Sequence, residues 1–118
     1  MIGGRMGYPA KYKIKTRQGQ TYRRVFTWTI DSEPVDLTGY IARMQVRRRP
    51  NAASPVILDV TDDITIDAEE GQLEVMIPAS VLAAIPPDTY VYDLELDNAG
   101  TVTTLIAGSF QVDPEVTR

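Results

Sequence analysis

The sequence contains neither cysteine nor histidine among its 118 residues. Without cysteine the chain has no disulfide framework, no thiolate metal site and no cysteine nucleophile. Without histidine it lacks the most common general base and the most common metal ligand of proteins. A carboxylate-only enzyme remains as an alternative, but we expect that the chain is not an enzyme and that it holds no metal or cofactor.

Long apolar runs are also missing. No segment approaches the roughly 18 to 20 apolar residues that a membrane-spanning helix needs. The first seven residues, MIGGRMG, lack the apolar centre of a signal peptide. Gly3-Gly4 is followed by no helical pattern, so it does not form a phosphate-binding loop. These absences predict a soluble protein without a membrane anchor or a secretion signal.

The composition is that of one globular domain. Hydrophobic residues make up 43% of the chain and charged residues 24%, so the chain can build a core without cross-links. We expect a flexible basic arm over residues 1–11 and a β-sandwich domain over residues 12–118. The glycine-rich start and the alternating lysines suggest that the basic segment 1–17 orders on a neighbouring protein.

Charge is distributed unevenly along the chain. Residues 1–49 contain eleven basic and three acidic residues, a net charge of +8. Residues 50–118 contain one basic and thirteen acidic residues, a net charge of −12. Whether these halves form two oppositely charged faces depends on how the strands interleave, which the sequence leaves open.

Apolar and polar side chains alternate over most of the chain, as in half-buried strands. The expected strands are Tyr12–Arg17, Gln20–Ile30, Tyr40–Arg48, Val56–Val60, Ile64–Asp67, Leu73–Ile77, Thr89–Leu96 and Thr101–Val112. One short helix is expected over Ala79–Ile85, ended by Pro86-Pro87. The pattern predicts an all-β fold, an antiparallel immunoglobulin-like β-sandwich of about eight short strands with one short helical crossover.

The alternation also predicts which side chains face the core. Phe26 and Trp28 are expected to point inward. In the last strand, one face is expected to carry Val102, Thr104, Ile106, Gly108, Phe110 and Val112. The basic first strand, Tyr12–Arg17, is typical of an edge strand, where lysines discourage unwanted pairing.

Three groups of charged residues are candidate sites. Asp62, Asp63, Asp67, Glu69 and Glu70 lack the spacing of a calcium loop, so a solvated loop is the favoured interpretation. Asp93, Glu95 and Asp97 repeat at steps of about 7 Å along one strand, which favours an outward polar face over a glycosidase pair. Nucleic-acid binding by the arginines and lysines is disfavoured by the net charge of −4.

Protein–protein contact is the better use of the basic residues. The expected interface consists of charged side chains from both halves of the chain. They are Arg5, Lys11, Lys13, Lys15, Arg43, Arg47, Arg48, Arg49, Asp93 and Glu95.

A series of segments resembles a known group of proteins. QGQTYRR precedes FTW, and then come VDLTGY, ARMQVR, YVYDLEL, GTVT and GSFQV. This series resembles small structural proteins of tailed phages and prophages, and the N-terminal sandwich of upper-baseplate proteins, over about residues 12–117. Its most specific piece is DLTGY followed by the alternating basic strand.

The resemblance implies a virion component, assembled in the host cytoplasm, that joins tail or baseplate parts or attaches fibres. Its implied partners are other virion proteins and copies of itself in a symmetric assembly. We expect no membrane partner, and nucleic acid is a disfavoured partner because of the net charge. Because this chain ends at Arg118, we expect no receptor-binding portion. The alternatives are a head decoration subunit and a module that binds carbohydrate or nucleic acid.

Overall fold

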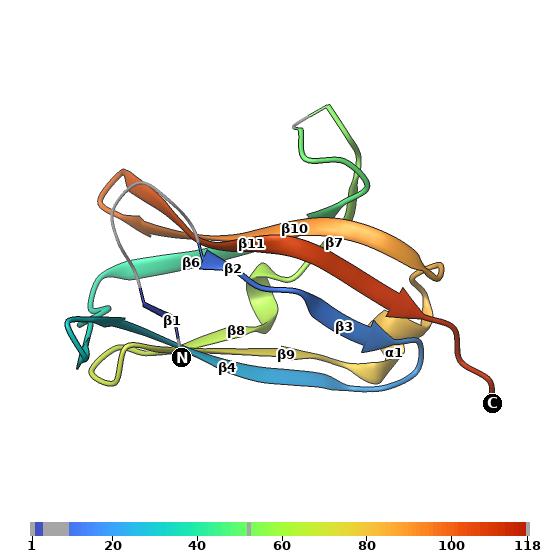
Figure 1. Cartoon of the computed structure of the whole chain (residues 1–118), viewed down its shortest axis with the longest axis horizontal. Helices are drawn as coiled ribbons and strands as arrows, with labels where there is room; N and C mark the ends of the chain where they lie inside the picture. The colour runs from blue at the N-terminus through green and yellow to red at the C-terminus, as the bar shows by residue number, and fades with distance from the viewer. Residues whose placement is uncertain (1, 4–9, 52, 118) are drawn as a thin grey trace.

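The chain folds into two β-sheets that face each other (Figure 1). The computed structural model describes residues 2–3, 10–51 and 53–117. One sheet has the order β1-β4-β9-β8, with β5 also paired to β4. Its strands are β1 (Ile2–Gly3), β4 (Tyr22–Ile30), β5 (Glu33–Pro34), β8 (Ile64–Asp67) and β9 (Gln72–Ile77).

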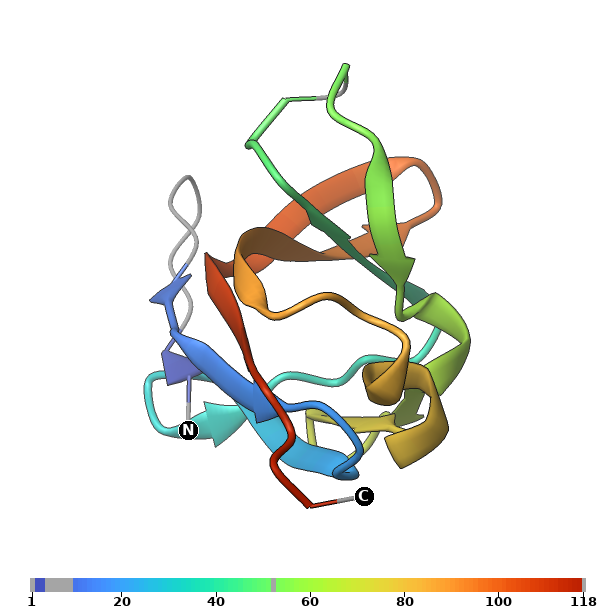
Figure 2. The ribbon, with the colours of Figure 1, turned by 90° about the vertical axis from the view of Figure 1, so that its right-hand side faces the viewer.

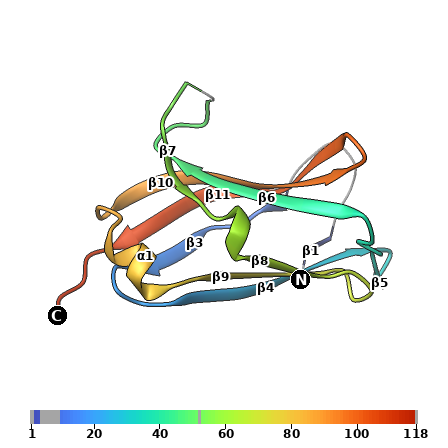
Figure 3. The ribbon, with the colours of Figure 1, turned by 180° about the vertical axis from the view of Figure 1, so that it is seen from behind.

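The second sheet has the order β2-β11-β10-β6-β7, and β3 also pairs with β11. Its strands are β2 (Ala10–Lys11), β3 (Ile14–Arg17), β6 (Tyr40–Arg47), β7 (Val56–Asp59), β10 (Asp88–Asn98) and β11 (Thr101–Asp113). A 3-10 helix, η1 (Thr61–Asp63), and a short α-helix, α1 (Ala79–Ala83), connect the two sheets (Figure 3).

This strand order is the immunoglobulin order. β4, β9 and β8 stand where an immunoglobulin domain has strands B, E and D, and β11, β10, β6 and β7 stand where it has G, F, C and C′. The predicted all-β sandwich is therefore confirmed, and each of the eight expected strands forms. The described residues add three two-residue strands, β1, β2 and β5, and the pairings of β1, β2 and β3 are parallel.

The core lies between the sheets and is built from the inward side of each alternation. Phe26 is buried as predicted, and Trp28 is partly buried against the core, with its ring edge-to-face on Tyr40 at 6.2 Å. The inner side of β10 carries Tyr90, Tyr92, Leu94 and Leu96, all buried.

The last strand departs from the simple alternation because it contains a β-bulge. Leu94 pairs with Ile106, but Glu95 pairs with Thr104, so Leu105 is an extra residue on β11. Leu105 and Ile106 are consequently both buried. Val102 is 48% exposed on the opposite face, so the prediction that it shares a face with Phe110 is wrong.

The basic strand β3 lies at an edge, as predicted. Within the described part of the chain it pairs only with β11 and exposes Lys15 and Arg17 while burying Ile14 and Thr16. Gly108 of β11 lets Tyr12, which lies just before β3, approach closely. A Cβ at position 108 would collide with the carbonyl oxygen of Tyr12. The Tyr92 hydroxyl donates a hydrogen bond of 2.6 Å to the same oxygen.

The predicted arm, residues 1–11, falls mostly outside the described residues, which omit residues 1 and 4–9. Of the remainder, Ile2–Gly3 pairs with β4 and Ala10–Lys11 pairs with β11. The arm and its role in binding stay a prediction.

Tyr90 closes the corner between α1 and β10. Its ring is fully buried, and its hydroxyl donates a hydrogen bond of 2.6 Å to the carbonyl oxygen of Pro86, four residues earlier. Immunoglobulin sandwiches carry a comparable tyrosine corner at this place. The bond fixes the point at which the chain crosses from one sheet to the other.

Replacing Tyr90 with phenylalanine keeps the ring and removes this bond, so we expect the free energy of unfolding to fall by about 1 kcal/mol. Urea unfolding followed by circular dichroism measures the change. Tyr40→Phe is the matched control, because the Tyr40 hydroxyl makes no hydrogen bond to the described residues. Equal losses in the two variants would contradict this role for Tyr90.

Alkaline pH should destabilise the fold. Burial raises the pKa of Tyr22 to about 12, and burial also raises the pKa of Tyr92. Above about pH 10 the unfolded chain therefore releases these protons before the folded chain does, and stability falls as pH rises. Unfolding at about pH 9 and about pH 11 measures the loss, which Tyr22→Phe should reduce. An unchanged pH dependence in that variant would contradict the assignment.

Candidate protein-binding surface

Half of the predicted interface residues lie on or beside the outer face of the six-stranded sheet. Alternation along β6 sends Met44 and Val46 into the core and Arg43, Gln45 and Arg47 outward. The register between β6 and β10 then places Arg43 opposite Glu95 and Gln45 opposite Asp93. A basic strand and an acidic strand thus lie side by side.

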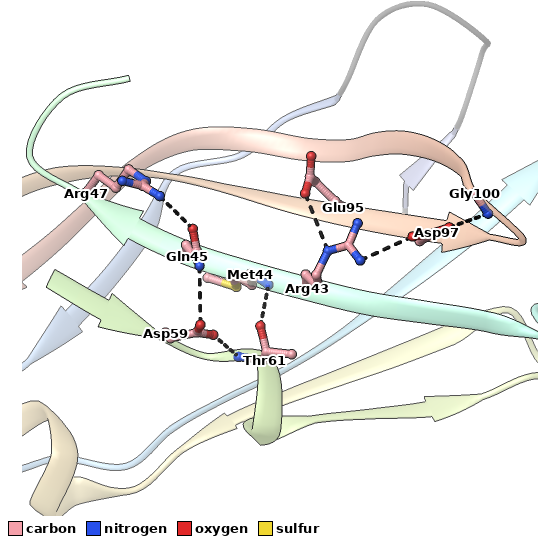
Figure 4. Close-up of polar contacts among 9 residues, drawn as sticks. All are labelled: Arg43, Met44, Gln45, Arg47, Asp59, Thr61, Glu95, Asp97 and Gly100. Carbon is pink, nitrogen blue, oxygen red and sulfur yellow. Dashed lines mark hydrogen bonds and ion pairs between the residues drawn. The ribbon is translucent and has the colours of Figure 1, made fainter. Parts of the chain in front are cut away.

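Arg43 joins the two strands through a pair of carboxylates (Figure 4). Its Nη1 lies 3.2 Å from Asp97 Oδ2, and its Nε lies 3.8 Å from Glu95 Oε1. The other oxygen of Asp97 accepts the backbone N–H of Gly100 at 2.9 Å. Such half-exposed pairs contribute less than about 1 kcal/mol each, so their main effect is to hold the side chains and the β10–β11 turn in position.

A second chain of hydrogen bonds crosses from β6 to β7 and η1 (Figure 4). Arg47 donates to Gln45 Oε1 at 2.9 Å, and Gln45 donates to Asp59 Oδ2 at 3.3 Å. Asp59 also accepts the backbone N–H of Thr61 at 2.9 Å. Hydrogen bonds from the Thr61 hydroxyl and backbone lower the pKa of Asp59, with a smaller contribution from Gln45.

The loop between β6 and β7 projects from the sandwich (Figure 2). Its residues Arg49, Pro50 and Asn51 wall a hollow on this face. The hollow measures about 390 Å³. It is lined by Gln45, Arg47, Arg49, Pro50, Asn51, Val91, Tyr92, Asp93, Glu95 and Ala107.

The loop is held by its own polar contacts, apart from residue 52, which is not described. Asn51 Oδ1 accepts the N–H of Ser54 at 2.9 Å, and Ser54 Oγ accepts the N–H of Arg49 at 3.2 Å. Arg47 donates to the carbonyl oxygen of Ser54. Ser54 is only 8% exposed, so the base of the loop is packed although its tip is not.

Five of the ten predicted interface residues meet around the hollow. These are Arg43, Arg47, Arg49, Asp93 and Glu95, with Arg43 reaching it through its ion pair to Glu95. Lys11 stands at the margin of the same face, because the register places it beside Ala107 and Ala107 beside Asp93.

The other predicted residues lie elsewhere. Lys13 and Lys15 are exposed along the edge segment that ends in β3. Arg48 pairs with Asp88 at 3.0 Å and lies over the Tyr90 ring at 5.4 Å from its centroid, away from the hollow. Arg5 lies outside the described residues.

Several residues of this face were not predicted from the sequence. Gln45 and Asp59 belong to the hydrogen-bonded chain, and Ile41 and Val102 flank Asp97, with Ile41 61% exposed. The alternation Arg43, Gln45, Arg47 was the available signal for Gln45. The positions of Ile41 and Val102 beside Asp97 depend on the strand register and on the β-bulge. No signal in the sequence therefore showed that these residues are neighbours.

Asp93, Glu95 and Asp97 form the outward polar face that the sequence predicted. Within the described ranges, no group of three or more acidic residues is arranged to hold a metal ion. No helix in the described part of the chain is long and apolar enough to cross a membrane.

Comparisons with known proteins establish no family. No family model matches the chain, and no curated protein matches it. Among solved structures, the chain is similar to the "N-terminal domain of phage TP901-1 ORF48", with a TM-score of 0.48, 12% identity, and coverage of 98% of this chain and 94% of that chain. It is also similar to a chain from "Structure-based site-directed photo-crosslinking analyses of multimeric cell-adhesive interactions of VGSC beta subunits", with a TM-score of 0.44, 11% identity, and coverage of 92% and 96%.

Removing the Ser54 hydroxyl should loosen the loop. Ser54→Ala leaves the Arg49 N–H without its acceptor, a loss of about 1 kcal/mol that makes local opening roughly fivefold more frequent. Native-state digestion with trypsin, which cleaves after arginine, reports this opening at Arg48. Ser80→Ala, at an exposed position of α1, is the control and should leave the cleavage rate unchanged. Equal rates for the two variants would contradict the contact.

Proposed function

We propose that the chain is a non-catalytic structural protein that binds other proteins through the outer face of the six-stranded sheet. The observation that carries this proposal is the walled hollow on the hydrogen-bonded outer face of the six-stranded sheet, where Asp93 is exposed and forms part of the lining. Asp93 forms no ion pair with a described residue, so its charge is available to a partner.

The composition of the face suits a protein partner. Ile41 and Val102 supply exposed apolar surface at one end, and Val56 supplies it at the edge strand. Between them lie charged groups of both signs, most of them held by partners within the sheet. Protein interfaces combine apolar and polar surface in this way, and side chains that are already held lose less entropy on binding.

The finer assignment is to a tailed-phage virion, as a tail or baseplate part or a fibre-attachment adaptor. It is supported by the series of segments described above, of which DLTGY and the strand ARMQVR are the most specific. ARMQVR is the centre of β6, which contributes to the candidate surface, and DLTGY leads into the start of that strand. The alternative is a head decoration subunit, which would lie on the capsid and not on the tail or baseplate.

Incorporation into particles tests the proposal. In the phage that encodes the chain, Asp93→Arg should leave the protein folded and remove it from purified virions, because the charge facing the partner is reversed. Deleting residues 1–10 should also leave the fold intact, since the buried core begins at Ile14, and should abolish incorporation. Mass spectrometry of purified particles measures both losses.

Glu70→Arg is the control, because it makes the same charge change at an exposed turn remote from the hollow. It should be incorporated normally. Normal incorporation of the Asp93 variant would contradict the binding surface, and absence of the unaltered protein from virions would contradict the phage assignment. Electron microscopy with labelled protein distinguishes the tail from the head.

A further inference from the structure

The sandwich has two lateral sides of opposite charge. One side, facing the viewer in Figure 1, is formed by β2, β3 and the start of β4. The other side, facing the viewer in Figure 3, is formed by β7, η1 and β8. The basic side carries Lys11, Lys13, Lys15, Arg17 and Arg24, and the acidic side carries Asp59, Asp62, Asp63 and Asp67.

The five cations of the basic side are all exposed. Four of them, Lys11, Lys13, Lys15 and Arg17, alternate with Tyr12, Ile14 and Thr16, which face inward. Arg24 reaches this side by lying over the Tyr12 ring, with Cζ 5.1 Å from its centroid. Lys15 and Arg17 share Asp113 at 4.0 and 3.9 Å. Lys11 and Lys13 form no ion pair with the described residues, so this side keeps an excess of positive charge.

The acidic side has no compensating cation of its own. The sequence contains no lysine or arginine from Pro50 to Thr117, which includes all of β7, η1 and β8. None of the four carboxylates forms an ion pair with a described residue. Asp62 and Asp67 are exposed, on η1 and at the end of β8 respectively.

Both sides are also strand edges. β7 ends the six-stranded sheet and β8 ends the five-stranded sheet on the acidic side, while β2 and β3 end the six-stranded sheet on the basic side. Edge strands present unpaired backbone groups to a neighbour, and edge charges of one sign prevent two like edges from pairing. Here the basic sides of two copies repel each other, as do the acidic sides, whereas the basic side of one copy attracts the acidic side of another.

We propose that copies of this chain associate side by side, with the basic side of one copy against the acidic side of the next. Such a contact is heterologous, so repetition closes into a ring or continues as a filament. The proposal deepens the proposed function by naming a second copy as one partner. It uses the lateral sides and leaves the hollow on the outer sheet face free for a different protein.

The purified chain tests this inference without the phage, so its failure is distinguishable from failure of the virion assignment. Sedimentation velocity over a range of protein concentrations should show self-association at low salt that is lost at high salt, because exposed charges are screened within about 10 Å at 0.1 M salt. A monomer at every concentration in low salt, or association that salt does not weaken, would overturn the proposal.

Charge reversal identifies the two sides. Lys11→Glu with Lys13→Glu removes most of the excess positive charge of the basic side, and Asp62→Lys with Asp67→Lys cancels the net negative charge of the acidic side. Each variant alone should associate at least about tenfold more weakly than the unaltered chain, because the attraction between the two sides is then lost. A mixture of the two variants should associate again, since the unaltered acidic side of the first variant can contact the unaltered basic side of the second.

Glu33→Lys with Glu70→Lys is the matched control for the acidic side, since it changes the net charge equally in β5 and in the turn between β8 and β9, away from β7 and η1. This control should self-associate as the unaltered chain does, and circular dichroism should show all variants folded. Equal weakening in the control, or a mixture of reversed variants that stays monomeric, would overturn the assignment of the contact to these sides.

Discussion

The register between β6 and β10 is the constraint on which both the core and the candidate surface depend. It pairs Met44 with Leu94 on the inner face and Arg43 with Glu95 on the outer face. Because side chains alternate along a strand, a slip of one residue would place Arg43 in the core and Met44 in water. Burial of Met44, Leu94 and their neighbours therefore sets the position of every charged group around the hollow. The ion pairs of Arg43 then adjust orientation within a register that the core has already chosen.

The segment before β4 completes the sandwich along one side. Its approach depends on the missing side chain of Gly108 and on the hydrogen bond from Tyr92 to the Tyr12 carbonyl oxygen. Once Ile14 and Thr16 are buried, Lys13, Lys15 and Arg17 must face outward. The exposed positive charge of the basic side is thus a consequence of how this edge packs against the core. The same contacts that stabilise the fold here also determine which side chains are exposed on this side.

Much of the architecture could be predicted from local patterns. Alternation located the eight longer strands, and Pro86-Pro87 placed the end of α1 at Ile85, two residues beyond its observed end at Ala83, because both signals act within a few residues. The bulge at Leu105 escaped prediction because alternation is intact on either side of it, and only pairing with β10 reveals the extra residue. The hollow could not be predicted either, because it too depends on segments that are distant in the sequence. Its wall is a loop held by Asn51 and Ser54, and its floor comes from β6, β10 and β11, which meet only in the folded sheet.

The sequence by itself determined that the chain is an all-β domain with a basic first part and an acidic second part, since composition and alternation are properties of the chain. Only the tertiary structure decided where those charges act. It places the basic strand β6 beside the acidic strand β10, so on the outer face the two halves largely neutralise each other. At the lateral sides no such interleaving occurs, because β2 and β3 end the six-stranded sheet on one side while β7 and β8 end the two sheets on the other. The order of the strands therefore brings the basic and acidic parts of the chain together on the outer face and keeps them apart on the two lateral sides.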